Sequence, residues 1–546
     1  MTEITKGITY LNEYKSLKKA VDEGKTPVLT VGLSAIHKAN LAAALGADTA
    51  RPVLVLTDDD NAANRFAADL RGFSEREVVV LPPRELVMAD VAGVSRGYEQ
   101  ARLAALDTLS GACFAVASVQ AAAQRTMPPA LLASSIVTLK AGEEAPLDEL
   151  THRLTDAGYE RCSQVEGMGQ FSVRGGILDI FPPQAEHPYR VEFWDDEIDS
   201  ISTFDVGSQR RLEQCETLRC LPCMEALPSL AQGGAAGLAK AVAALASSRR
   251  KKQHAELQKN LERDAERLRE SGTLPAADKY LPLIYPQMAT AFDYLPENTL
   301  ILIEDTPRLR DAARDFHARI ADDVTALMER GELPGGMDGY ALDFAGICSI
   351  KRQIVRMDSF LNSIPELAPQ HLENFVANQM NAYGGNLDMA SADIRSYTEQ
   401  GRAVAVVCGS TLRCKNMFDA LTDSGLNVKI SDLLPKGDCV NIMEGTISAG
   451  FEYPDLGLVV MTEGQVLARR KKAKVKRSNR DRVKSFTDLS PGDLVVHEHH
   501  GIGRFIGMER MTVDGSERDF IKIAFAGTDF LYVPATSLDL ISKYIG

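Results

Sequence analysis

Four residues, Gly32, His37, Lys38 and Ala39, have the spacing of a phosphate-binding P-loop. In that motif a glycine-rich turn follows a strand, so that backbone N–H groups surround the phosphates, a lysine supplies charge and a hydroxyl binds magnesium. In this chain His37 replaces the second glycine and Ala39 replaces the hydroxyl residue. We therefore expect a degenerate P-loop that neither binds nor hydrolyses ATP, and no bound cofactor.

A second possible element of a nucleotide site is the pair Glu304 and Asp305, which ends an expected strand at residues 299–304. Carboxylates in such a position bind magnesium in nucleotide-hydrolysing enzymes. Because this chain lacks a phosphate-binding loop, we interpret the two carboxylates as surface groups. An ATPase is therefore the less favoured hypothesis for this chain.

Two groups of potential metal ligands occur, and neither is complete. Cys215, Cys220 and Cys223 include a Cys-x-x-Cys pair, which can bind zinc, but no second pair or histidine follows at the usual spacing. The run from His497 to His500 is a second candidate, but alternate residues of a strand face opposite sides, so few of these side chains share a face. We expect buried cysteines, a polar strand edge and no metal.

Length and composition indicate a protein of several domains. The chain has 546 residues, 45% of them hydrophobic and 25% charged, as is typical of globular proteins. Its net charge of −14 argues against binding of nucleic acid along the whole chain. Nine scattered cysteines, and no apolar run near the ~20 residues that a membrane helix needs, favour a cytoplasmic protein without a membrane span.

The first part of the chain alternates short β-branched runs with helical patterns. Strands are expected at residues 27–31, 53–57, 78–81 and 114–118, with helices between them. This alternation predicts an α/β fold in which a parallel sheet has helices on both faces. The strand at 299–304 would continue the sheet after an intervening segment.

That intervening segment begins with an insert of mixed α and β structure. Closely spaced strands are expected within residues 170–181 and at 189–194. A long helical stretch follows from 235 to 272, with leucines at helical spacing among charged residues. We interpret this stretch as one half-solvated helix with Leu257, Leu261 and Leu268 on its buried side.

The remaining chain contains a second α/β pattern, a basic segment and a small β-domain. Strands are expected at 403–408 and 458–461, and residues 469–484 then contain ten Lys or Arg against one Asp. We interpret the basic segment as a solvated linker, with a DNA-binding module as the alternative. Strand runs separated by turn residues predict a small C-terminal β-barrel of the SH3/Tudor kind, which usually binds a partner; these runs are 494–497, 520–525 and 530–533.

Several segments have a specific family pattern. Three lie in the insert: Arg174-Gly-Gly-Ile-Leu-Asp-Ile-Phe-Pro, Tyr189-Arg-Val-Glu-Phe-Trp-Asp-Asp-Glu and Phe204-Asp-Val-Gly-Ser-Gln-Arg. They resemble the transcription-repair coupling factors. Two more, Ser490-Pro-Gly-Asp-Leu-Val-Val-His and Leu531-Tyr-Val-Pro, resemble the RNA-polymerase-interacting domain of the same family. The resemblance extends over nearly the whole chain and is weakest between about residues 230 and 470.

This resemblance implies a non-catalytic adaptor that joins the repair protein UvrA to the β subunit of RNA polymerase. Family members continue into a DNA-translocating ATPase motor, which would lie beyond this chain, and contact with DNA is expected through that motor. The implied parts are a UvrB-like domain 1a with the degenerate P-loop at 1–135, a UvrA-binding insert at 136–220, a UvrB-like domain 1b at 221–345, an α/β domain of unknown role at 346–465, the basic linker at 466–485 and the polymerase-interacting domain at 486–546.

Strand periodicity suggests which residues of the insert face solvent. Tyr189, Val191 and Phe193 fall on one face of their strand, which leaves Arg190 and Trp194 on the other face. Truncation of Arg190 or Trp194 is therefore expected to remove surface contacts and to leave the fold intact.

A neighbouring strand supplies a further candidate residue. Phe171 and Val173 are expected in the core and Arg174 on the polar side. The resemblance implies that Arg174, Arg190 and Trp194 bind UvrA, in keeping with the frequent use of arginine and tryptophan as anchors of protein interfaces.

For the C-terminal domain, the resemblance implies that an exposed strand pairs with a strand of the polymerase β subunit. The candidate strand is 494–499, and the candidate residues are Val496, His497 and Glu498. Glu498 stands where some relatives have an apolar residue, so a less apolar contact is expected here.

Overall fold

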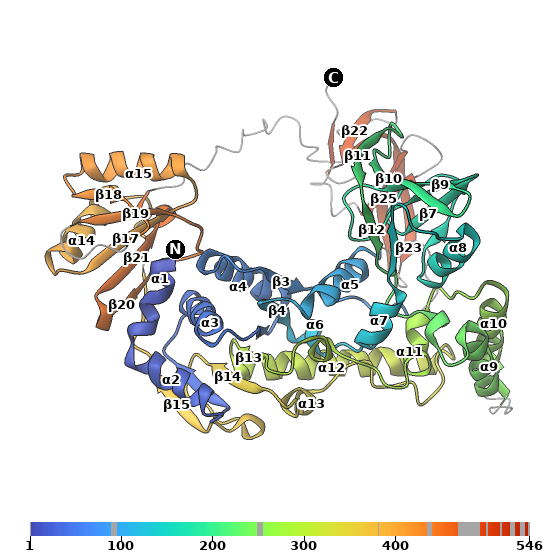
Figure 1. The fold of residues 1–546 in the computed structure, drawn as a ribbon, viewed down its shortest axis with the longest axis horizontal. Coiled ribbons are helices and arrows are strands. Elements are labelled where there is room, and N and C mark those ends of the chain that lie inside the picture. The colour runs from blue at the N-terminus through green and yellow to red at the C-terminus, as the bar shows by residue number, and fades with distance from the viewer. Residues whose placement is uncertain are drawn as a thin grey trace. The chain divides into compact units, whose positions relative to one another are not determined.

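The computed structural model describes residues 2–88, 96–247, 255–380, 382–433, 439–467, 492–497, 501–513, 516–524, 530–534 and 541–543. Contacts divide the chain into two compact units, residues 1–467 and 468–546. The helices and strands of both units are labelled in Figure 1.

A seven-stranded parallel sheet forms the centre of the first unit. Its strands are β1 (Val28–Val31), β2 (Val53–Thr57), β3 (Val78–Leu81), β4 (Phe114–Ser118), β13 (Leu300–Ile303), β14 (Gln353–Met357) and β15 (His371–Asn374). Their order is β15-β1-β14-β13-β2-β4-β3, and every neighbouring pair is parallel. The predicted parallel sheet is therefore confirmed.

Helices cover both faces of this sheet. They are α1 (Thr2–Gly7), α2 (Asn12–Asp22), α3 (Ala35–Thr49), α4 (Asp60–Phe73), α5 (Gly97–Leu109), α6 (Val119–Ala123) and α12 (Thr306–Glu329). Val53 and Val55 of β2 lie in one core with α1 to α4, whereas Leu54 and Leu56 lie in a second core with α5, α6 and α12. Because successive residues of β2 enter opposite cores, both of its faces must be apolar, as residues 53–56 are.

The last two strands of this sheet lie beyond the domain boundary expected at residue 346, where the second α/β pattern was predicted to begin. β14 pairs with both β1 and β13, and β15 pairs with the other side of β1. A boundary at 346 therefore cuts through one hydrogen-bonded sheet. The second α/β region begins after residue 374.

A second, mixed sheet has the order β16-β20-β21-β17-β19-β18. Its strands are β16 (Asn378–Gln379), β17 (Ala403–Cys408), β18 (Val428–Ile430), β19 (Val440–Glu444), β20 (Phe451–Tyr453) and β21 (Leu458–Thr462), and its helices are α14 (Leu387–Glu399), α15 (Thr411–Asp423) and α16 (Glu463–Val466). Ala405 and Val407 of β17 share the core of α1, α3 and α4, while Val404 and Val406 pack with α14 and α15. One layer of helices thus lies between the two sheets.

The insert is a separate sheet with its own core. The chain enters it through β5 (Val137–Lys140) and leaves it through β12 (Thr217–Cys220), which pair antiparallel. Between them lie α8 (Leu147–Asp156), β6 (Glu160–Arg161), β7 (Gln170–Arg174), β8 (Ile177–Ile180), β9 (Tyr189–Trp194), β10 (Glu197–Phe204) and β11 (Arg211–Cys215). The six strands β6 to β11 are hydrogen-bonded in chain order, and Leu150 and Leu154 of α8 pack on one face of them.

The helical stretch expected at 235–272 contains two helices, α9 (Gly234–Ser247) and α10 (Ala255–Ser271), which pack against each other. Leu257, Leu261 and Leu268 are buried, as their spacing predicts. The short helices α7 (Pro129–Ser135), α11 (Leu281–Ile284) and α13 (Phe344–Cys348) complete this unit. Among the described helices of the chain, none is both long and apolar enough to cross a membrane.

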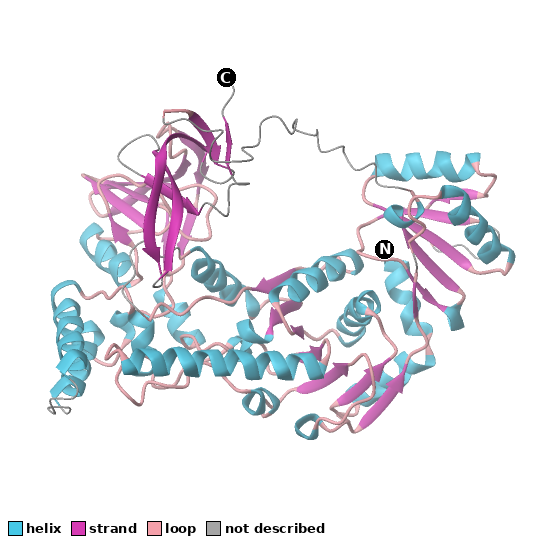
Figure 2. Ribbon diagram, turned by 180° about the vertical axis from the view of Figure 1, so that it is seen from behind, coloured by secondary structure: helices cyan, strands magenta, loops and turns pink. Residues whose placement is uncertain are grey.

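The described strands of the second unit form one antiparallel sheet. All described strands of the chain are drawn in magenta in Figure 2. The strands of this sheet are β22 (Leu494–His497), β23 (Gly501–Val513), β24 (Ser516–Ala524), β25 (Phe530–Pro534) and β26 (Ile541–Lys543), in the order β25-β24-β23-β22-β26. Since β25 and β26 end this order, closure into an SH3/Tudor-like barrel stays a prediction. The predicted basic segment at 469–484 lies outside the described residues.

Candidate protein-binding surfaces

Gly32, the first residue of the P-loop pattern, lies against another segment of the same chain. Its φ is +85°, and a Cβ atom there would lie 2.1 Å from the carbonyl oxygen of Phe375. The backbone N–H of Phe375 donates to the carbonyl oxygen of Val31 over 3.0 Å, which holds the two segments together. The glycine is therefore required by the left-handed backbone and by this close approach, whether or not a phosphate binds.

His37 is a packed residue in the core between the two sheets. Its side chain is 0% exposed, and its ring centroid lies 5.2 Å from that of Phe451 and 5.0 Å from that of Tyr453, both edge to face. Nδ1 lies 2.8 Å from Oγ of Ser34, the residue before α3. Burial lowers the pKa of His37 to about 4, so the ring is neutral at pH 7.

The same helix also makes a polar contact with β20. The hydroxyl of Tyr453 donates to Oδ1 of Asn40 over 2.9 Å, and both residues are buried. The first turns of α3, where a P-loop helix faces phosphate, therefore hold the second sheet in place. Sequence reasoning missed this role, because the partner residues lie about 400 positions away in the chain.

Lys38 is buried beside carboxylates at the carboxyl ends of the parallel strands. It is 4% exposed, and burial lowers its pKa against the opposing charges of Glu304, Asp305 and Asp358. Burial raises the pKa of Glu304 to about 7, although the charge of Lys38 acts in the other direction. Glu304 is therefore not the simple surface group that was expected. Ala39 is also fully buried and has no oxygen for magnesium.

Two predicted arginines of the insert share one buried carboxylate. Arg190 of β9 donates from Nε to Oδ1 of Asp179 over 2.6 Å and from Nη2 to Oδ2 over 2.9 Å. Arg174 of β7 donates to the same Oδ2 over 2.6 Å. Asp179 belongs to β8, which lies between those strands, and it is 1% exposed. The structure thus brings Arg174 and Arg190 together through a residue that sequence reasoning missed.

The two arginines differ in their exposure. The side chain of Arg190 is 14% exposed, and that of Arg174 is 50% exposed. The guanidinium of Arg190 lies 4.6 Å from the ring centroid of Phe204 and donates to Oε1 of Gln209 over 3.2 Å. Arg190 is therefore built into the insert, so we now expect its truncation to destabilise the insert, in contrast to the expectation from strand periodicity.

Trp194 lies on the same face of β9 as Arg190 and is exposed to solvent. It ends β9 just before the turn to β10, where Asp195 has φ +57°, and its side chain is 81% exposed. On the opposite face Val191 is fully buried, and Phe193 packs half-buried against the same core. The predicted alternation along β9 is confirmed, and it places a large apolar side chain in solvent.

The predicted polymerase-binding strand has no free side. Val495 and Val496 of β22 pair with β23 on one side and with β26 on the other. Residues 495–497 therefore lie between two partner strands, and the expectation that this part of the strand offers an edge for pairing is wrong. His497 ends this strand, and Glu498 lies outside the described residues.

The three cysteines considered for zinc belong to the core of the insert. Cys220 and Cys223 are buried and Cys215 packs half-buried against the same core. Burial raises the pKa of Cys220 to about 12, which disfavours the thiolate that zinc requires. Within the described ranges no group of three or more His, Cys, Asp or Glu side chains has the geometry to hold a metal ion.

Comparisons with known proteins assign both regions to domain families. The family described as the UvrB interaction domain matches residues 137–225, and the CarD-like/TRCF RID domain matches residues 489–545. The transcription-repair-coupling factor of Bacillus subtilis (strain 168) is 31% identical to this chain, and that of Staphylococcus aureus (strain USA300) is 26% identical. Each alignment covers 100% of this chain and 47% of the relative, so the chain spans about half the length of these curated relatives. Along its whole length the chain is homologous to the transcription-repair-coupling factors, and it contains the UvrB interaction and RID domains.

Proposed function

We propose that this chain is the N-terminal, non-catalytic part of a transcription-repair-coupling factor. In this role the insert binds UvrA, and the C-terminal unit binds the β subunit of RNA polymerase. DNA translocation would belong to the remaining half of the relatives' length. The observation that supports the adaptor role best is Trp194, which is 81% exposed on the domain that matches the UvrB interaction family.

The polar face of the insert has the features of a protein-binding surface. Trp194 offers exposed aromatic area, and Arg174 offers a half-exposed guanidinium that Asp179 holds in one position. An arginine held in advance loses less side-chain entropy when it binds, and a carboxylate of the partner is its natural acceptor. We therefore assign Arg174 and Trp194 to direct contact with UvrA. Arg190 supports this contact mainly through Asp179.

For RNA polymerase the RID match supports a contact on the C-terminal unit. Because residues 495–497 of β22 are paired on both sides, we propose that the candidate residues Val496, His497 and Glu498 contact the polymerase through their side chains rather than by an added strand. This form of the proposal makes the polymerase contact sensitive to the charge of Glu498. It does not require a free sheet edge.

We also propose that this chain does not hydrolyse ATP. At the P-loop positions, His37 and Ala39 are buried and Gly32 packs on Phe375. Lys38 is buried, and the charges of Glu304, Asp305 and Asp358 act on it from within the same chain. These observations support the adaptor role over the ATPase alternative.

The test is a calorimetric titration of UvrA into the wild-type chain and into Trp194→Ala. We expect the substitution to weaken UvrA binding at least roughly tenfold, because an exposed tryptophan at an interface often contributes about 2 kcal/mol to the binding free energy. Phe360→Ala is the matched control, because Phe360 is also 81% exposed but lies outside the insert. Unchanged affinity in Trp194→Ala, or an equal loss in Phe360→Ala, contradicts the UvrA assignment.

A further inference from the structure

The chain leaves the insert through residues 221–227, here called the exit segment. Its first half is bonded to the insert: the N–H of Cys223 donates to the carbonyl oxygen of Ala157 over 2.9 Å, and Leu221 accepts from the hydroxyl of Tyr159 over 2.7 Å. Almost every residue of the segment is buried. Because these hydrogen bonds hold its first residues on the insert, the exit segment has no flexible hinge at that end.

The second half of the exit segment is bonded to α5 and to Tyr285, the residue after α11. The N–H of Glu225 donates to Oε1 of Glu99 over 2.7 Å. The hydroxyl of Tyr285 donates to the carbonyl oxygen of Glu225 over 2.8 Å and accepts from the N–H of Leu227 over 3.1 Å. The segment therefore passes from one body to the other with backbone bonds to each.

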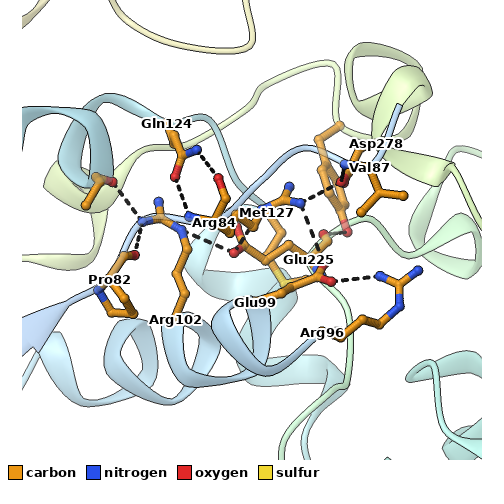
Figure 3. Close-up of polar contacts among 12 residues, drawn as sticks. Pro82, Arg84, Val87, Arg96, Glu99, Arg102, Gln124, Met127, Glu225 and Asp278 are labelled. Atoms are coloured by element: carbon orange, nitrogen blue, oxygen red, sulfur yellow. Dashed lines mark hydrogen bonds and ion pairs between the residues drawn. The ribbon is translucent and has the colours of Figure 1, made fainter. Parts of the chain in front are cut away.

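The side chain of Glu225 is the centre of a buried charge cluster, which Figure 3 shows. Its Oε1 lies 3.1 Å from Nε of Arg84 and 3.1 Å from Nε of Arg102, and all three side chains are at most 1% exposed. Neither contact has the alignment of a hydrogen bond. Glu225 thus serves as a shared counter-charge for two arginines that are shielded from solvent.

Three carboxylates and three arginines balance each other in this cluster. Besides Glu225, Asp278 lies 2.7 Å from Nη1 of Arg84, and Glu99 lies 2.7 Å from Nη1 of Arg96. The cluster joins α5, which contains Glu99 and Arg102, to the exit segment and to the chain at Asp278. Loss of one member would leave an uncompensated charge in the interior.

Buried ion clusters contribute little net stability, because desolvation offsets the attraction between the charges. They do disfavour every arrangement that separates the charges, so they select one geometry. A second ion pair between the same bodies, Arg219 of β12 with Asp107 of α5, is half-exposed on the arginine side and should contribute little. The two pairs therefore form a natural comparison.

We propose that Glu225 is a positioning residue that fixes the insert in one orientation on α5. The face with Trp194 then points in a fixed direction relative to the first sheet. Only the identity of the partner that uses this face rests on the proposed function. The orientation itself depends on the contacts above.

The test compares Glu225→Gln with Arg219→Gln in the whole chain. Hydrogen exchange of residues 221–227 should become at least roughly tenfold faster in Glu225→Gln and stay near the wild-type rate in Arg219→Gln. Trp194 is the chain's single tryptophan, so its fluorescence anisotropy decay reports on the insert alone. Glu225→Gln should add a faster component that the other variant lacks.

Protection of β7 to β10 in the same exchange experiment shows whether the insert itself stays folded. If Glu225→Gln does not fold, Glu225→Asp replaces it, since it keeps the charge and shortens the reach, and faster exchange of the exit segment is again expected. Wild-type exchange in the exit segment, or an equal effect of Arg219→Gln, overturns the proposal. UvrA is not used, so failure of the UvrA assignment would be seen separately.

Discussion

The carboxylate of Asp179 binds the guanidinium of Arg190 through two parallel contacts, at 2.6 Å and 2.9 Å, inside the sheet of the insert. Arg174 shares the same carboxylate, yet half of its side chain stays in solvent. One acid therefore holds both a structural arginine and an arginine available to a partner. The two arginines should respond differently to truncation.

Arg190→Ala should lower the free energy of unfolding of the insert by about 2 to 4 kcal/mol, because Asp179 is buried and would keep Arg174 as its single partner. Arg174→Ala should cost less than about 1 kcal/mol, since its side chain is half-exposed. Chemical denaturation followed by circular dichroism measures both values. Equal losses in the two variants would show that Arg190 is not the structural member of the pair.

Five strands of the first sheet, β1 to β4 and β13, were predictable because each is a short, mainly apolar run that is buried on both faces. The strand β15, with the sequence His371-Leu-Glu-Asn, has no such pattern and is a strand because β1 offers it a free side. These residues form a strand because they pair with a segment more than 300 residues away in the chain. Local sequence patterns contain no information of that kind, and the boundary at 346 was misplaced for this reason.

The alternation along β9 identified the exposed Trp194, but it did not reveal the charge balance of the surface. Asp179 stands between Leu178 and Ile180, two buried residues of β8. A single acid in an apolar strand is a usable signal, since it must face the other side and find a cation there. The role of His37 left no such signal, because nothing near it in sequence points to Phe451.

Val496→Pro and Glu498→Arg should separate fold from binding in the C-terminal unit. Proline at Val496 should disrupt the sheet, because β22 is paired on both sides and a proline cannot donate to either ladder. Glu498→Arg should leave the sheet intact and weaken polymerase binding at least roughly tenfold if that side chain lies in the interface.

Hydrogen exchange of β23 and β24 reports on the sheet, and pull-downs with polymerase and with UvrA report on binding. Both variants should keep wild-type UvrA binding, because the insert belongs to the other compact unit. Polymerase binding at the wild-type level in Glu498→Arg would remove that residue from the proposed contact. Loss of UvrA binding in either variant would contradict the separation of the two units.

Restoring the P-loop pattern should not restore ATP binding. The variant with His37→Gly and Ala39→Thr should show no saturable binding of magnesium ATP in calorimetry, because Gly32 still packs on Phe375 and Lys38 stays buried. Removal of the His37 ring should also destabilise the first unit by about 3 kcal/mol or more, as for other buried rings. Saturable ATP binding by the wild-type chain would contradict the adaptor proposal directly.

The buried His37 should make the first unit less stable in mild acid. The pKa of His37 is about 4 in the folded chain and 6.5 in the unfolded chain. Between these pH values the unfolded state binds more protons, so the stability of the folded state falls as pH falls. The full effect is about 3 kcal/mol at most. It should be absent from the pH dependence of His37→Gln, which has no titrating ring.

Glu304 should have the opposite effect in an overlapping range. Its pKa is raised from 4.5 to about 7, so the folded state binds more protons between these values, and stability falls as pH rises. Unfolding free energies measured from pH 4 to pH 8 for the wild type, His37→Gln and Glu304→Gln separate the two groups. Relative to the wild type, His37→Gln should gain stability towards pH 4 and Glu304→Gln should gain it towards pH 8. Parallel curves for all three proteins would mean that neither group has the shifted pKa that its burial implies.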